Sequence, residues 1–100
     1  MSKSDSHNRA QANAAGKNGK TEVPLKNGQR LDALTKNGKA TEIERCGNCD
    51  AAAKRLKISG AKQKVMQVPQ NDMYKAVNAM KKNGVKGTVK NMSGTKRKSV

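Results

Sequence analysis

The sequence predicts a small α+β domain, in which two helices pack on a three- to five-stranded mixed sheet that contains an antiparallel β-meander. Two observations carry this prediction. Residues 20–45 alternate apolar and polar side chains, and Asn-Gly pairs at 27–28 and 37–38 mark hairpin turns between them. Residues 49–59 and 72–82 have helical patterns, with a short strand expected at 63–68 between them. The predicted order of elements is αβββαβα-like, with a further strand in VKGTVKNM.

The meander segment is expected to have two chemically different faces. Pro24 places the first strand at an edge of the sheet, where its missing N–H costs nothing. The odd-numbered residues of these strands are expected to face the core: Val23, Leu25, Leu31, Ala33 and Ile43. The even-numbered residues carry the charged side chains of the other face: Glu22, Arg30, Asp32, Glu42 and Glu44.

Both helices have recognisable ends. The first is expected to begin near Asn48 or Asp50 and to stop at Gly60. The second, capped by Asn71 or Asp72, is expected to bury one stripe of side chains at helical spacing: Met73, Ala76, Val77 and Met80.

The chain is long enough for one small domain. Residues 1–19 are expected to form a flexible polar arm or a weak helix begun by Ser4 or Asp5, residues 20–92 the folded domain, and residues 93–100 a basic disordered tail. No apolar run approaches the roughly 20 residues of a membrane span, and the N-terminus lacks the apolar core of a signal peptide. We therefore expect a cytoplasmic site of action and no membrane partner.

The charge balance indicates a polyanionic partner. The chain has 22 Lys and Arg residues against 7 Asp and Glu, a formal net charge of +15. Such an excess favours nucleic acid, either DNA or RNA. Because Tyr74 is the only aromatic residue, stacking on bases is not expected to be the main mode of recognition. The basic residues expected to contact nucleic acid are Arg30, Arg45, Lys54, Lys57, Lys62 and Lys64.

The few acidic residues are regularly spaced. Glu22, Asp32 and Glu42 recur every ten residues, and Glu44 follows. If Leu25 pairs with Gln29 around the first turn, Glu22 lies opposite Asp32. An odd-length second loop likewise brings Asp32 opposite Glu42, whereas a two-residue Asn-Gly turn would separate them. The two turns are not expected to be the same tight three-residue kind, so the second should be a five-residue loop or include a bulge.

Carboxylates on facing strands repel one another unless protons, lysines or a cation neutralise them. Oxygen ligands favour Mg²⁺ or Mn²⁺, and Mg²⁺ commonly takes one or two carboxylates together with a substrate phosphate. The expected metal ligands are Glu22, Asp32 and Glu42. The alternative is a solvated sheet face on which the acids pair with Arg30, Lys20 or Lys64.

The segment GQRLDALTKNGKATEIER resembles the core of the PD-(D/E)XK nuclease superfamily. The resemblance covers about residues 20–68 and implies an αβββαβ core in which Asp32 and Glu42 bind metal and Glu22 is an additional acid. Glu44 stands where that family usually has lysine, which leaves the general base open. Arg30 or Lys64 could supply the missing positive charge. In size and basic character the chain also resembles C-terminal nuclease modules of bacterial polymorphic and contact-dependent toxins, which implies an acidic immunity or inhibitor protein as a partner.

Cys46-Gly-Asn-Cys49 has the spacing of half a zinc site, but the chain offers only His7 and no second Cys pair, so a reduced pair at a strand-to-helix turn is expected. His7 is expected to be exposed in the N-terminal arm, with an approach to the sheet as general base as the alternative.

These observations favour a magnesium-dependent nuclease that cleaves DNA or structured RNA, with Asp32, Glu42 and Glu44 as catalytic residues. The alternative is a non-catalytic basic protein that binds RNA or DNA, such as a ribosome-associated, nucleoid or virion component.

Overall fold

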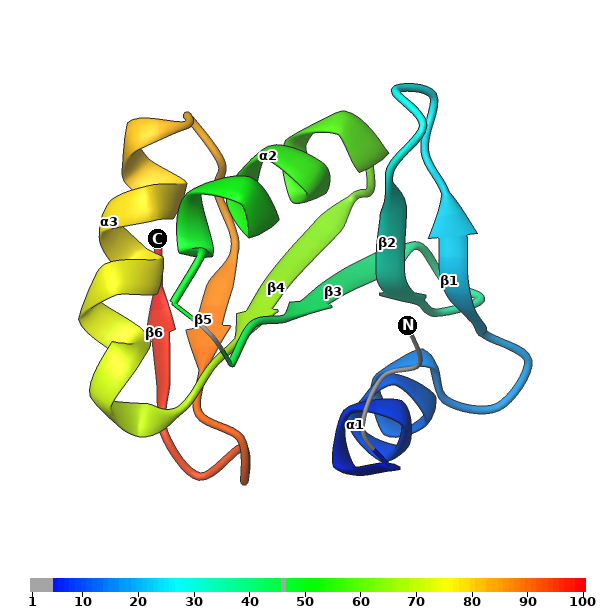
Figure 1. Ribbon diagram of the computed structural model, residues 1–100, viewed down its shortest axis with the longest axis horizontal. Coiled ribbons are helices and arrows are strands. Elements are labelled where there is room, and N and C mark those ends of the chain that lie inside the picture. The colour runs from blue at the N-terminus through cyan, green and yellow to red at the C-terminus, as the bar shows by residue number, and fades with distance from the viewer. Residues whose placement is uncertain (1–4, 46) are drawn as a thin grey trace.

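The computed structural model describes residues 5–45 and 47–100, which form a six-stranded mixed sheet with helices on both faces (Figure 1). The sheet follows chain order, from β1 at one edge to β6 at the other. Strands β1, β2 and β3 form the antiparallel meander, β4 and β5 continue parallel to β3, and β6 returns antiparallel to β5. In order, the elements are α1 (Asp5–Ala15), β1 (Lys20–Pro24), β2 (Arg30–Leu34), β3 (Lys39–Ile43), α2 (Cys49–Ser59), β4 (Gln63–Gln67), the 3₁₀ turn η1 (Gln70–Asp72), α3 (Met73–Lys82), β5 (Thr88–Lys90) and β6 (Arg97–Ser99).

The predicted α+β class and mixed sheet are confirmed, but the number of elements is larger than expected. Three α-helices form in the described residues, because residues 5–15 fold as α1. The tail expected to be disordered contains β6, which pairs with β5 and makes the sheet six-stranded. Its hydrogen bonds come from the backbone, including one of 2.8 Å from the N–H of Val100 to the carbonyl of Gly87. A polar, basic composition gives no signal for such an edge strand.

Local signals set the two later helices. Helix α2 begins after Asn48, whose side chain accepts a hydrogen bond from the N–H of Ala51, and it ends at Gly60 in the left-handed conformation (φ 63°). Helix α3 buries Met73, Ala76, Ala79 and Met80, while Val77 is partly buried against the same core. Both helices therefore lie where the sequence predicts them.

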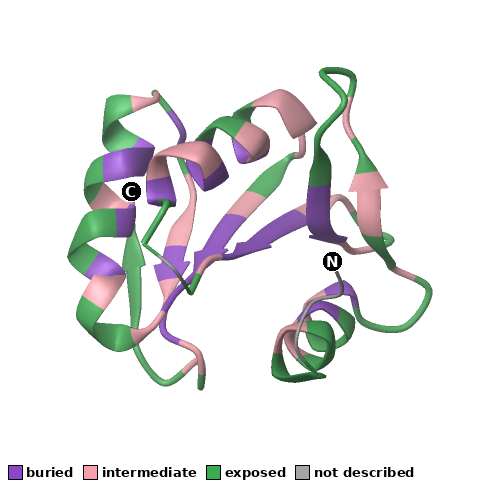
Figure 2. Ribbon diagram, viewed as in Figure 1, coloured by how far each residue is buried: buried purple, intermediate pink, exposed green. Residues whose placement is uncertain are grey.

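The helices divide between the two faces of the sheet. Helix α2 packs against β2, β3, β4 and α3, and α3 packs against β5, whereas α1 contacts β1, β2 and β3 from the other side (Figure 1). The main core lies under α2 and α3, and Figure 2 shows the buried central strands between more exposed edges. Its largest fully buried apolar side chains are Leu31, Leu56, Met66, Met80, Val68 and Val89.

The two hairpin loops are of the same three-residue kind, which corrects the expectation that they differ. In the first, the N–H of Leu25 donates to the carbonyl of Gln29 at 2.8 Å. In the second, the N–H of Thr35 donates to the carbonyl of Lys39 at 2.9 Å. Each loop ends in a left-handed glycine, with φ 87° at position 28 and 91° at position 38. Strand β2 must therefore hydrogen-bond to both β1 and β3 with a backbone whose N–H and C=O groups do not alternate regularly between the two sides.

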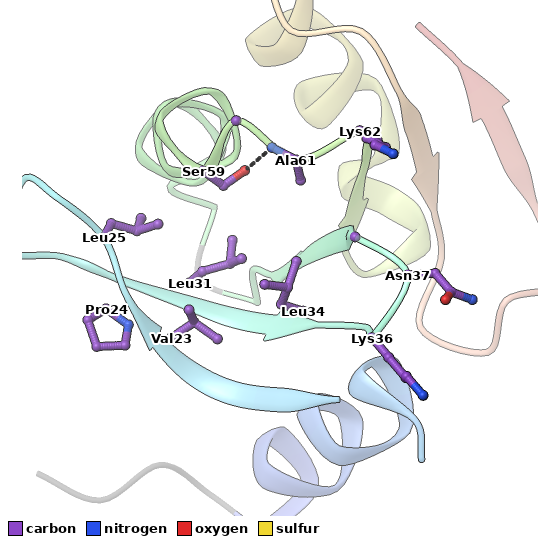
Figure 3. A pocket seen from close by; sticks show the side chains of 12 residues that line it. Val23, Pro24, Leu25, Leu31, Leu34, Lys36, Asn37, Ser59, Ala61 and Lys62 are labelled. Atoms are coloured by element: carbon purple, nitrogen blue, oxygen red, sulfur yellow. Dashed lines mark hydrogen bonds between the residues drawn. The ribbon is translucent and has the colours of Figure 1, made fainter. Parts of the chain in front are cut away.

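Strand β2 accommodates the two loops by changing face near its middle. Leu31 and Leu34 both border an apolar cavity of about 670 Å³ between the first hairpin and the end of α2 (Figure 3). In an unbroken strand, side chains three residues apart point to opposite faces. On the neighbouring strand, Glu22 has a left-handed backbone (φ 52°), which is uncommon for a residue other than glycine. The irregularity is centred on the acidic residues.

The predicted core face is only partly correct. Leu31 belongs to the main apolar cluster, and Val23 and Leu25 pack against it, but β3 contributes Ala40 rather than Ile43. Ala33 and Ile43 are buried outside this cluster. The change of face in β2 explains why strict alternation from the first strand gives the wrong face in the third.

A search of the described residues finds no helix that combines the length and the apolar character needed to cross a membrane.

Candidate functional site

The register of the meander brings the three regularly spaced acids next to one another. Val23 pairs with Leu31 and Thr21 with Ala33, so Glu22 faces Asp32 across β1 and β2. On the other side, Ala33 pairs with Thr41, which places Asp32 across from Glu42. The β1–β2 ladder nevertheless skips the pair Glu22–Asp32, and the β2–β3 ladder ends before the pair Asp32–Glu42. The predicted register is correct, and the strand pairing is interrupted at Asp32.

Side chains replace backbone partners at this interruption. The N–H of Asp32 donates to Glu42 Oε2 at 2.8 Å, and the N–H of Ile43 donates to Asp32 Oδ2 at 2.8 Å. Each carboxylate therefore accepts a hydrogen bond from the backbone of the opposite strand. Buried N–H groups need such partners, and bonds to a charged acceptor are stronger than neutral ones. This exchange holds Asp32 and Glu42 together where β2 and β3 separate.

Glu42 is buried beneath α2. Its side chain is 1% exposed, and Oε1 accepts a hydrogen bond of 2.6 Å from Nε of Arg55 on α2. The parallel register pairs Glu42 with Met66, a residue of the main core, so both side chains point toward that helix. The expectation that Glu42 faces away from the core is therefore wrong, and Arg55 was not expected as its partner.

The electrostatic position of Glu42 is unusual. The pKa of Glu42 is raised from 4.5 to about 7: burial raises it most, the neighbouring Asp32 carboxylate adds to the rise, and Arg55 and the N–H of Asp32 oppose both effects in part. Arg55 thus does not fully compensate the loss of water and the like charge. Near neutral pH the Asp32–Glu42 pair can exchange a proton or accept positive charge.

Helix α1 closes the site from the other face. The side-chain amide of Gln11, which is 3% exposed, donates hydrogen bonds to Glu22 Oε2 and, at 3.0 Å, to Asp32 Oδ1. His7 Nε2 lies 3.5 Å from the same Asp32 oxygen, and the His7 side chain is only 15% exposed. The expectation of an exposed His7 is therefore wrong, and its approach to the sheet is the arrangement observed. Gln11 gave no signal in the sequence, because a single glutamine in a polar segment resembles any solvated residue.

A cavity of about 440 Å³ opens over the carboxylates. Glu22, Asp32 and Glu44 reach it from the strands and their ends. Its lining consists of His7, Glu22, Gln29, Arg30, Asp32, Ile43, Glu44 and Arg55. Glu44 Oε2 also accepts a hydrogen bond from the N–H of Asn48 at 3.3 Å. The cavity therefore joins three predicted acids with two guanidinium groups, and Glu42 lies below it.

The donor set has the right chemistry for a hard cation. Asp32 and Glu42 supply carboxylate oxygens, which are the hard ligands that Mg²⁺ takes in proteins. Within residues 5–45 and 47–100, however, no three Asp, Glu, His or Cys side chains are arranged to hold an ion. Mg²⁺ commonly takes only one or two carboxylates and completes its shell with water and phosphate oxygens. The pair fits such an ion, whereas a site enclosed by protein ligands alone is not formed.

The basic residues predicted to bind nucleic acid do not gather in one place. Arg30 lines the acidic cavity, and Arg45 lines a different cavity together with Arg9 and Lys90. Lys54 forms an ion pair of 3.1 Å with Asp50, and Lys57 is exposed on the same helix. Lys62 and Lys64 border a third cavity, whose lining includes Lys39, Lys86, Lys90 and Arg97. Lys39, Lys86, Lys90 and Arg97 were not among the residues expected to contact nucleic acid.

Cys49 is a buried free thiol in the first turn of α2 and belongs to the main core. Burial, together with nearby Glu44 and Asp72, raises its pKa, which disfavours the thiolate. Cys46, the other half of the motif, lies outside the described residues.

Comparisons with known proteins found no matching family model, no similar curated protein and no similar solved structure.

Proposed function

We propose that the chain is a metal-dependent nuclease whose reaction centre is the cavity over Asp32 and Glu42. The observation that carries the proposal is a buried carboxylate pair, bordered by Glu22, Glu44, Arg30 and Arg55, in a chain of net charge +15. The order α1-β1-β2-β3-α2-β4 agrees with the αβββαβ order that the resemblance to PD-(D/E)XK nucleases implies.

The residues around the cavity would have different roles in binding and cleaving a phosphodiester. Arg30 and Arg55 lie at its wall and can hold phosphate oxygens, for which guanidinium groups have matching geometry. Asp32 and Glu42 would hold a divalent cation, which supplies charge stabilisation at the phosphate and a more acidic bound water. Glu44 lines the cavity and would accept a proton from water there, and His7 lies beside Asp32 as a second candidate base.

A direct test uses supercoiled plasmid and transfer RNA as substrates. We expect cleavage with Mg²⁺, none with EDTA, and a fall of at least about a hundredfold for Asp32→Asn, which keeps the shape of the side chain but removes its charge. Asp72→Asn is the matched control, because Asp72 lies outside the cavity and pairs only weakly with Lys75, at 3.7 Å. Cleavage that persists in EDTA and in Asp32→Asn would exclude this mechanism.

One observation favours a second function, that of a non-catalytic nucleic-acid-binding protein. All four oxygens of Asp32 and Glu42 accept hydrogen bonds from N–H groups, one of them from Arg55. In this second function the role of the pair is to stabilise the interrupted sheet. This function predicts binding without turnover, and binding that is unchanged in Asp32→Asn.

A further inference from the structure

A basic surface lies on the sheet face that points away from α2 and α3. Lys90 pairs with Gln67 on one side and with Arg97 on the other, and Lys39 pairs with Gln63. Paired residues share a face, and residues two apart in a strand do so too, so Lys39, Lys90 and Arg97 point the same way. The alternate residues, such as Met66 and Val89, point into the core beneath the helices.

These side chains line a cavity of about 470 Å³, whose lining residues come from β3, β4, β5, β6 and the loops beside them. Six basic residues border it: Lys39, Lys62, Lys64, Lys86, Lys90 and Arg97. No acidic residue of the described chain is among the lining residues. The surface is therefore distinct from the acidic cavity under α1.

The concentration of positive charge on this face is costly for the folded chain. Lys90 and Arg97 are direct cross-strand neighbours, and like charges in such positions are destabilising. The pKa of Lys90 is lowered by burial and by the nearby charges of Lys39 and Arg97. An anion bound between these residues would relieve the repulsion. An exposed sheet face could equally carry acids or neutral residues, which would avoid the cost.

The chemistry of the surface selects the type of anion. Several cations spread along four adjacent strands match a series of phosphates better than a single small ion. No aromatic residue lines the cavity, and Tyr74, which is 63% exposed, borders a different one beside α3. Stacking platforms for unpaired bases are therefore missing from its lining, which favours a duplex read through its backbone.

We propose that the face formed by Lys39, Lys90 and Arg97 binds the phosphate backbone of duplex nucleic acid. This binding does not require cleavage at the carboxylate pair, and it would apply to a nuclease and to a non-catalytic protein alike. Lys90 also borders the cavity that contains Arg9 and Arg45. The surface therefore continues toward α1, the helix that closes the acidic site.

The test measures binding of a 20-base-pair DNA duplex in EDTA, so that cleavage plays no part. The variant Lys39→Gln/Lys90→Gln/Arg97→Gln is compared with Lys54→Gln/Lys75→Gln/Lys82→Gln, which removes the same charge from lysines paired with Asp50 or Asp72. We expect the first variant to weaken binding at least about tenfold more than the second. Its log–log salt slope should also decrease by about 0.9 for each lost phosphate contact.

Equal weakening by both triple variants would overturn the proposal, because net charge alone would then explain binding. Tighter binding of the matched single strand, or of phosphatidylserine vesicles, would also overturn it. Thermal unfolding checks that the first variant is folded. Its melting temperature should be no lower than that of the wild type, since it loses the repulsion between Lys90 and Arg97. A large fall in its melting temperature would contradict the argument that these charges oppose one another.

Discussion

The backbone N–H of Asp32 bonds the side chain of Glu42 at 2.8 Å, at a position where a regular antiparallel ladder would supply a carbonyl. In return, Asp32 accepts the N–H of Ile43 on the strand of Glu42. The interruption of the sheet and the concentration of acids are thus one feature, and three predictions follow from its chemistry.

The first prediction concerns pH. Below about pH 4.5 Glu42 is protonated in both folded and unfolded chains, and between 4.5 and about 7 only the folded chain keeps the proton. Stability from this group is therefore present at low pH and lost as pH rises through 7, by roughly 3 kcal/mol. Urea unfolding from pH 4.5 to 8 should show this decline in the wild type. Glu42→Gln should lack it, because its side chain does not titrate.

Glu44→Gln is the control for this experiment, since Glu44 lies at the cavity but is not fully buried. It should retain the wild-type decline. Because Glu42→Gln also loses the carboxylate contact with Arg55, its whole curve is displaced, and the comparison is therefore one of slopes. Equal slopes in the wild type and Glu42→Gln would contradict the raised pKa.

The second prediction concerns divalent cations. If Asp32 and Glu42 bind Mg²⁺, the ion should raise the melting temperature at pH 8, with stabilisation growing as the logarithm of its concentration above Kd. Asp32→Asn should abolish the rise, whereas Asp72→Asn should leave it unchanged. Differential scanning calorimetry at several Mg²⁺ concentrations measures this. A rise that is equal in all three proteins would place the ion elsewhere.

The third prediction concerns the attachment of α1. Gln11→Ala removes the donor that joins this helix to Glu22 and Asp32. Because it leaves buried carboxylate oxygens with fewer donors, we expect a loss of about 1–3 kcal/mol in the free energy of unfolding. Asn8→Ala, at an exposed position of the same helix, should not destabilise the protein. Chemical denaturation of both variants measures this, and comparable losses would show that the buried contact of Gln11 is not responsible, since alanine has the higher helix propensity at both positions.

The sequence by itself determined the features that depend on neighbouring residues. Asn48 and Gly60 set the ends of α2, and glycines at 28 and 38 set two hairpin loops whose odd length aligns the acids. Tertiary structure decided how those acids are used. Two identical loops force β2 to change face, which carries Glu42 under α2 to Arg55, and α1 then covers Asp32 through Gln11. Such contacts join residues far apart in the chain and depend on the summed geometry of several elements, so no local pattern encodes them.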